Sequence, residues 1–154
     1  MMKKITLTLL VSLVTIGAAL AQIENPVKWS YAAKKISDKE YDIYITANID
    51  NKWHVYAQDA GEGPEPTTIS FVKNPLVTNV GKPKEQGKLE KEYDNNFNSV
   101  LKFYSTKVSF VQRVKLKTNV TTVVKGAVNF MVCNDKKCLP PKSIPFSVSV
   151  GGKS

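Results

Sequence analysis

The amino-acid sequence is poor in the residues on which many functional sites depend. Its 154 residues include one histidine, one arginine and two cysteines, and the other basic residues are all lysines. Zinc sites need three or four protein ligands, so His54 with two cysteines makes a metal site a weak interpretation. Nucleic-acid binding is not expected either, because the lysines are scattered along the chain and form no dense basic cluster.

Long apolar runs are also scarce, and the single one lies at the start of the chain. It extends from Ile5 to Ala19, follows Lys3 and Lys4, and ends in Ala19-Leu-Ala21. A basic start, a short apolar run and small residues at its end are typical of a secretory signal peptide. The alternative is a membrane anchor, but even when counted to Ala21 the run has only about 17 residues, the bottom of the spanning range. We therefore expect residues 1–21 to be removed after Ala21.

The rest of the chain, residues 22–154, suits one exported domain. No second apolar run of spanning length follows, so stable membrane insertion is not expected after cleavage. Removing the two lysines of the predicted signal leaves 20 basic against 13 acidic residues, a net charge near +7. Scattered lysines of this kind are typical of a solvated surface, with a mild preference for acidic partners.

Helical periodicity is absent after residue 21, and a period of two replaces it. In Tyr41–Ile49, for example, every second side chain is apolar or small. Alternation in short runs between turn signals predicts half-buried strands. We expect an all-β fold, an immunoglobulin-like sandwich of about seven to nine antiparallel strands. Further alternating runs are Val27–Ala33, Trp53–Val55, Ile69–Phe71, Val108–Leu116, Val128–Val132 and Ile144–Val150.

Three polar segments are predicted to connect these strands. Asp59–Pro66 contains two prolines and two glycines, which exclude a central strand. Gly81–Gly87 is predicted to be a second polar connection. Tyr93–Ser99 is rich in turn-forming residues but includes Phe97, and an aromatic side chain in such a loop is expected to fold back onto the domain.

The two cysteines, Cys133 and Cys138, are separated by four residues and can form a staple, a metal clamp or a redox switch. An exported protein favours a disulfide. A ring of about six residues, however, contributes only about 2 kcal/mol in the loop-entropy model, so this pair is a weak staple. A copper(I) clamp would use both cysteines and Met131, although a methionine at this spacing is more often a packing residue.

A redox role requires an accessible sulfur whose thiolate is stabilised. Lys136 and Lys137 precede Cys138 and favour its ionised form, and Asp135 partly opposes them. A turn is predicted at Asn134-Asp135, which would place Cys138 at an exposed connection. The residues therefore leave a redox switch open beside a structural disulfide.

The chain resembles the N-terminal, periplasmic domain of the thiol:disulfide interchange protein DsbD. The resemblance extends over about Val27 to Val150 and depends on an ordered set of motifs. These motifs are Trp29 with Tyr31, Trp53-His-Val-Tyr-Ala57, Pro64-Glu-Pro-Thr67 before a strand, and Cys133-x4-Cys138-Leu-Pro-Pro141.

The resemblance implies that the cysteine pair carries electrons outside the cytoplasm. Such domains are reduced by a thioredoxin-like domain and in turn reduce periplasmic thioredoxin-like proteins. The matching positions imply that Cys138 forms the mixed disulfide and that Cys133 resolves it. They also imply a cap loop over Tyr93–Asn98, in which Phe97 shields the sulfurs and Asp94 is the nearby acid.

The chain departs from the family pattern at three points. The cysteine spacer has four residues where the family has five, and Asn95 stands where a second cap-loop acid is expected. No membrane or thioredoxin-like domain accompanies the domain, so we expect a separate membrane electron donor. No cofactor is expected. The alternatives to an exchange carrier are a non-catalytic binding module with a structural disulfide and, as a third, a copper-handling protein.

Overall fold

The structure, a computed structural model, describes residues 24–152, and the predicted signal peptide lies outside them. The described residues form eleven β-strands and no helix, so none of them belongs to a helix that could cross a membrane. The strands are β1 (Val27–Lys35), β2 (Glu40–Ile49), β3 (His54–Tyr56), β4 (Thr68–Phe71), β5 (Val77–Gly87), β6 (Glu90–Asp94), β7 (Ser99–Tyr104), β8 (Lys107–Leu116), β9 (Thr122–Phe130), β10 (Val132–Cys133) and β11 (Lys142–Val150).

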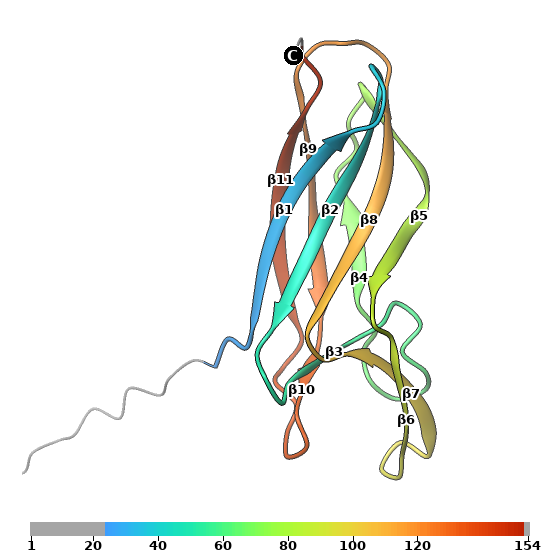
Figure 1. The fold of residues 1–154 in the computed structure, drawn as a ribbon, viewed down its shortest axis with the longest axis vertical. Helices are drawn as coiled ribbons and strands as arrows, with labels where there is room; N and C mark the ends of the chain where they lie inside the picture. The colour runs from blue at the N-terminus through green and yellow to red at the C-terminus, as the bar shows by residue number, and fades with distance from the viewer. Residues whose placement is uncertain (1–23, 153–154) are drawn as a thin grey trace, which may run out of the picture.

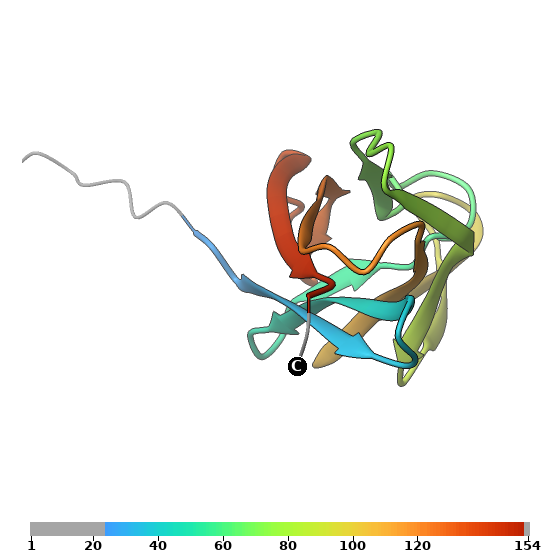
Figure 2. The ribbon, with the colours of Figure 1, turned by 90° about the horizontal axis from the view of Figure 1, so that it is seen from above.

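Two antiparallel sheets form a sandwich, as the alternating pattern predicts. One sheet has the strand order β1-β2-β8-β5 and the other β11-β9-β4. Seen from above, β11 and β9 lie on one side of the molecule and β1 and β2 on the other (Figure 2). The fold is therefore an all-β, immunoglobulin-like sandwich.

The core lies between these sheets because the strands direct alternate side chains inward. In β2, the residues Ile43, Ile45 and Ala47 are fully buried, while the residues between them are partly exposed. Phe110 of β8 lies beside them in the same sheet, and Val128 of β9 belongs to the opposite sheet; both are fully buried in the same core. Burying an aliphatic or aromatic side chain contributes about 1.5–3 kcal/mol, so this alternation supplies most of the driving force for folding.

A third, smaller sheet with the order β10-β3-β7-β6 extends from one end of the sandwich. In Figure 1 it lies at the lower end, below the long strands. One face of this sheet belongs to the main core, through Val55, Tyr104 and Val132. The opposite face carries a separate buried cluster, which includes Cys133. The small sheet thus packs onto the main core through one face and carries Cys133 on the opposite face.

Glu85 of β5 ties the small sheet to the sandwich. Its carboxylate accepts a hydrogen bond from the Tyr104 hydroxyl (2.8 Å) and another from the backbone N–H of Gln58 (2.6 Å). Tyr104 lies on β7 and Gln58 follows β3, so one side chain holds two parts of the small sheet against the large one.

The structure corrects one predicted connection and adds strands. Gly81–Gly87 is not a connection, because it belongs to β5, which pairs with β8 across a register shift between Val80 and Lys84. β5 is an edge strand exposed along most of its length, so it lacks an apolar alternation and tolerates Pro83. The eleven strands exceed the expected seven to nine because β5, the charged β6, the two-residue β10 and β7, whose burial does not alternate strictly, give no clear periodic signal.

Candidate functional site

The two cysteines face each other across the neck of a tight hairpin at the lower end of the molecule. Val132–Cys133 forms β10, residues 134–137 form the turn, and Cys138 returns beside Cys133. Backbone hydrogen bonds of 2.9 Å, Asn134 N–H to Lys137 O and Leu139 N–H to Val132 O, flank the pair on both sides. The Cα atoms of the cysteines are 4.0 Å apart and the sulfurs form a disulfide.

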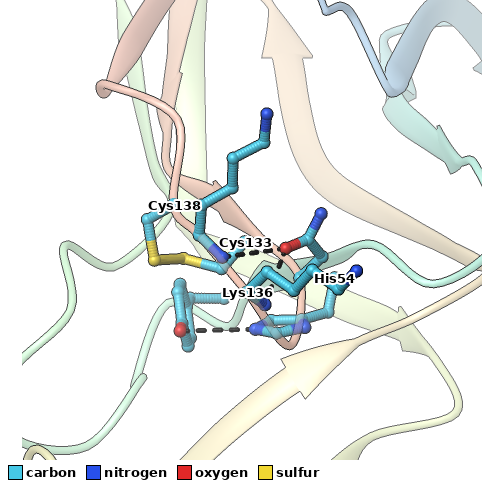
Figure 3. Close-up of a disulfide and its surroundings, with 7 residues drawn as sticks. His54, Cys133, Lys136 and Cys138 are labelled. Atoms are coloured by element: carbon cyan, nitrogen blue, oxygen red, sulfur yellow. Dashed lines mark hydrogen bonds between the residues drawn. A yellow bond between two sulfur atoms is a disulfide. The ribbon is translucent and has the colours of Figure 1, made fainter.

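Asn134 shapes the turn that separates the cysteines. Its Oδ1 accepts hydrogen bonds from the backbone N–H groups of Lys136 and Lys137, each at 2.9 Å (Figure 3). Asparagine commonly stabilises turns in this way because its short side chain reaches backbone groups two and three residues ahead. The turn therefore places two lysines directly before Cys138.

The two cysteines differ in exposure. Cys133 is 2% exposed, whereas Cys138 is an exposed residue. Cys133 belongs to the buried cluster on the outer face of the small sheet, with Tyr56, Leu101 and Phe103. An attacking sulfur from another protein can therefore approach Cys138 but not Cys133.

His54 lies directly beside the disulfide in the sheet. In the pairing of β10 with β3, Cys133 is opposite His54. Directly opposed residues of antiparallel strands project from the same face, with Cβ atoms about 4.5–5.5 Å apart. The His54 ring packs on Phe103, with centroids 4.6 Å apart, and its Nε2 lies 3.3 Å from the Tyr56 hydroxyl oxygen.

A pocket of about 740 Å³ opens over this face. Its floor includes His54, Tyr56 and Phe103, and both cysteines lie in its wall. The β6–β7 hairpin forms the facing wall and contributes Glu90, Glu92 and Asp94, while the cysteine hairpin contributes Asp135, Lys136 and Lys137. The pocket is thus acidic on one side and largely basic beside Cys138.

Burial and these charges act on the pKa values of two residues in the pocket. Burial lowers the pKa of His54, and the carboxylates of Asp135, Glu92, Glu90 and Asp94 oppose that effect. Burial also raises the pKa of Tyr56, with a smaller contribution from the charge of Asp94. Near neutral pH, the pocket therefore contains a neutral imidazole beside a protonated phenol.

The predicted cap loop is the tip of the β6–β7 hairpin. Asp94 ends β6, and its Oδ1 accepts hydrogen bonds from the backbone N–H groups of Asn96 (2.7 Å) and Phe97 (3.2 Å). The carboxylate thus stabilises the turn, in the same manner as Asn134 in the cysteine hairpin. Asn95 is exposed at the tip and does not line the pocket, whereas Asp94 and Phe97 do.

The Phe97 side chain packs against Gly63, which lies in the loop between β3 and β4. A Cβ atom added to Gly63 would lie 2.1 Å from Phe97 Cδ1, and Gly63 has a φ of +123°. The ring therefore occupies space that only a glycine leaves open. It remains 39% exposed and lines the same pocket as the cysteines.

The beginning of the described chain is attached to the cysteine hairpin. Glu24 Oε2 lies 2.6 Å from Lys137 Nζ, and the Glu24 carbonyl accepts a hydrogen bond from Lys142 Nζ at 3.3 Å. Both side chains of the ion pair are about half exposed, so the pair contributes little stability. The ion pair does engage Lys137, one of the two lysines that precede Cys138.

Within residues 24–152, no three His, Cys, Asp or Glu side chains are grouped in a way that could hold a metal ion. Met131 is half-buried and packs against the cluster that contains Cys133.

Sequence reasoning missed the part of the site that lies under the sulfurs. From the sequence alone, His54 is only a weak candidate metal ligand, and Phe103 falls in none of the predicted strands. The alternation of His54 and Tyr56 places both on one face, which was a usable signal. The pairing of β3 with β10, which brings His54 to Cys133, gives no local signal.

Comparisons with known proteins agree with these observations. The family model described as "Thiol:disulfide interchange protein DsbD, N-terminal" matches residues 24–149. No curated protein sequence gives a significant match.

Solved structures with this fold include related periplasmic domains. The N-terminal periplasmic domain of ScsB from Proteus mirabilis has a TM-score of 0.58 and 15% identity, over 83% of this chain and 47% of that one. The chain thus spans about half of the ScsB structure. The DsbD N-terminal domain of Neisseria meningitidis, in its reduced form, has a TM-score of 0.53 and 16% identity, over 82% and 87%.

The same Neisseria domain appears in a second structure, which describes its complex with the PilB N-terminal domain. That structure has a TM-score of 0.52 and 14% identity, over 82% of this chain and 87% of that one. At these identities the structural likeness establishes the fold, and the family model establishes the family. The chain belongs to the family of the N-terminal domain of the thiol:disulfide interchange protein DsbD.

Proposed function

We propose that this protein is an exported thiol–disulfide exchange carrier that passes reducing equivalents between thioredoxin-like proteins through Cys133 and Cys138. The observation that carries the proposal is the asymmetric disulfide at the wall of the pocket. Cys138 is exposed, and Cys133 is buried directly behind it. Exchange through a mixed disulfide needs one sulfur that a partner can reach and a second sulfur close enough to complete the reaction.

The reaction transfers two electrons in two displacements. In the reduced carrier, the Cys138 thiolate attacks one sulfur of the partner disulfide, and the other partner sulfur leaves as a thiolate. The Cys133 thiolate then attacks Cys138, which re-forms the carrier disulfide and releases the second partner sulfur. The partner is reduced, the carrier is oxidised, and a reduced donor reverses both steps to recharge the carrier.

The charges around Cys138 support its role as the attacking sulfur. Lys136 and Lys137 precede it, and positive charge stabilises a thiolate. Asp135 opposes them, and Glu24 occupies Lys137. Lys136 is therefore the residue that we expect to contribute most to activation of Cys138.

A purely structural role for the disulfide is less well supported. The hairpin is already closed by two backbone hydrogen bonds beside the cysteines. Closing so short a ring contributes only about 2 kcal/mol in the loop-entropy model. In addition, the related Neisseria domain has been crystallised in a reduced form.

Protein partners and an extracytoplasmic location complete the proposal. The complex of the Neisseria domain with the PilB N-terminal domain supports a protein as the exchange partner. The ScsB domain is described as periplasmic, which supports the same location here after removal of residues 1–21. A separate membrane electron donor would then reduce the carrier.

Trapping the mixed disulfide tests this function. In Cys133→Ser, the resolving sulfur is absent, so Cys138 should form a stable covalent adduct with an oxidised thioredoxin-like protein. The matched variant Cys138→Ser keeps only the buried sulfur and should form little adduct. Adducts would be detected by non-reducing electrophoresis and mass spectrometry. The proposal fails if Cys133→Ser forms no adduct while the wild-type disulfide resists reduced thioredoxin-like proteins.

A further inference from the structure

His54, Cys133 and Cys138 form a row across three adjacent chain segments. Cys133 is opposite His54 on one side and opposite Cys138 on the other. All three side chains therefore project from the same face of the small sheet. In Figure 3, the labelled His54 ring lies close to the cysteine hairpin. His54 is also the only histidine in the sequence.

The contacts of His54 fix its ring in one orientation. Phe103 packs on it, and Tyr56 meets it edge-on with centroids 5.2 Å apart. The Tyr56 hydroxyl oxygen lies 3.3 Å from Nε2, so one ring nitrogen shares a proton with the phenol. A neutral imidazole has one nitrogen without a proton, and that nitrogen can accept one.

The proposed exchange reaction requires a group that removes the proton from the Cys133 thiol. Cys133 must be a thiolate to attack the mixed disulfide, yet it lies in a buried, mostly apolar cluster. Such surroundings disfavour a charged sulfur. Lys136 and Lys137 lie beside Cys138 and not beside Cys133 in the sheet, so they do not supply a base for it.

The charged groups that face His54 come from three elements. Asp135, Lys136 and Lys137 belong to the cysteine hairpin, Glu90, Glu92 and Asp94 to β6, and Lys52 to the turn before β3. Phe103 from β7 is uncharged. Carboxylates predominate, and they favour an imidazolium once a proton has been accepted.

We propose that His54 accepts the proton of the Cys133 thiol during resolution of the mixed disulfide. This inference rests on the proposed exchange function. The S–H proton passes to the unprotonated ring nitrogen as the Cys133 sulfur bonds to Cys138. The bond between Cys138 and the partner sulfur breaks, and its electron pair leaves on the partner sulfur. The imidazolium then returns its proton to solvent or to the released thiolate.

The test follows the two displacements separately with an aromatic disulfide reagent whose released thiolate is coloured. The reduced carrier should release one thiolate as Cys138 attacks and a second as Cys133 resolves the adduct. In His54→Gln the second phase should slow about 100-fold near neutral pH, at the low end for general-base catalysis, while the first phase is unchanged. The matched variant Lys136→Gln should slow the first phase and spare the second.

The pH profile distinguishes proton transfer from a structural effect. In the wild type, the second phase should reach a plateau above the pKa of His54, measured by NMR on the single imidazole. In His54→Gln it should continue to rise with pH as the thiol itself ionises. This wild-type comparison also stands if the variant does not fold.

Two results would overturn the role of His54. One is a second phase with the same rate and pH profile in His54→Gln. The other is an equal slowing of both phases at every pH, which would mean that the ring only shapes the pocket. Absence of the first phase in the wild type, with no adduct in Cys133→Ser, would instead refute the exchange function on which the inference depends.

Discussion

Cys133 and Cys138 are covalently joined but chemically unequal. The strand pairing sets Cys133 into a buried cluster, and the Asn134 turn delivers Cys138 to the surface after two lysines. This difference follows from the strand pairing, because Cys133 lies between His54 and Cys138, whereas Cys138 follows the turn and is exposed. Access is one of the factors that set the rate of thiol–disulfide exchange, so the two sulfurs should differ in reactivity.

The stability of the oxidised protein should depend on pH through His54. Burial lowers the pKa of His54 in the folded state, below the value of about 6.5 in an unfolded chain. The unfolded chain therefore binds the proton first as the pH falls. The stability that the neutral ring provides is fully present above about pH 6.5 and is lost below it.

In His54→Gln, this part of the pH dependence should disappear. The free energy of unfolding, measured with denaturant between about pH 5 and about pH 8, should decrease less steeply with falling pH in the variant than in the wild type. One histidine accounts for at most about 1.4 kcal/mol per pH unit. Since the chain has no other histidine, identical slopes in the two proteins would contradict the burial of a neutral ring.

At the scale of elements, two hairpin tips bound the pocket, and they are built alike. Asn134 begins one tip and Asp94 the other, and each accepts two backbone N–H groups from the residues ahead. One tip carries the sulfurs and the other carries Phe97. In Figure 1 both tips project from the lower end of the molecule. We expect their relative position to affect how freely a partner reaches Cys138.

Gly63→Ala should disturb the second tip. The added methyl would overlap Phe97, and alanine is strained at a φ of +123°. We expect a loss of stability of about 1–3 kcal/mol. We also expect faster modification of Cys138 in the reduced protein, because the Phe97 ring must move away from residue 63. Thermal unfolding and the rate of thiol alkylation measure these two effects.

Gly81→Ala provides the matched control. Gly81 also has a positive φ, of +70°, but nothing lies within 4 Å of an added Cβ. This variant should lose stability without a change in the reactivity of Cys138. If Gly63→Ala and Gly81→Ala alter the alkylation rate equally, the packing of Phe97 against Gly63 does not control access to the Cys138 sulfur.

The elements predictable from sequence are those with one buried face. Tyr41–Ile49 has a strict alternation because one side of β2 meets the core, and the structure confirms the all-β sandwich. β5 gave no such signal because it is an exposed edge strand. The cysteine turn could be anticipated from Asn134, whereas the cross-strand pairing of His54 with Cys133 depends on tertiary structure and could not.

At the scale of the whole molecule, the small sheet that carries the site is held in place by contacts on its opposite face. Val55, Tyr104 and Val132 anchor the small sheet in the main core, and Glu85 links it to β5. None of these contacts involves the disulfide. The protein should therefore keep its fold in both redox states, as the proposed carrier function requires.

Reduction should cost little stability. We expect the free energy of unfolding to fall by about 2 kcal/mol or less when the disulfide is reduced, because the ring is short. Denaturant unfolding of the oxidised and reduced proteins measures the difference, with Cys133→Ser/Cys138→Ser as a control that has no thiols. Unfolding on reduction at room temperature would contradict this account and would indicate a structural staple.

The reduction potential of the Cys133–Cys138 pair tests the central claim most directly. The protein would be equilibrated with thiol–disulfide buffers of defined potential, and the reduced fraction would be counted by alkylation and mass spectrometry. An exchange carrier should have a potential above about −300 mV, within reach of thioredoxin-like proteins. A potential below about −300 mV, in the range of structural disulfides, would contradict the claim that this protein carries electrons.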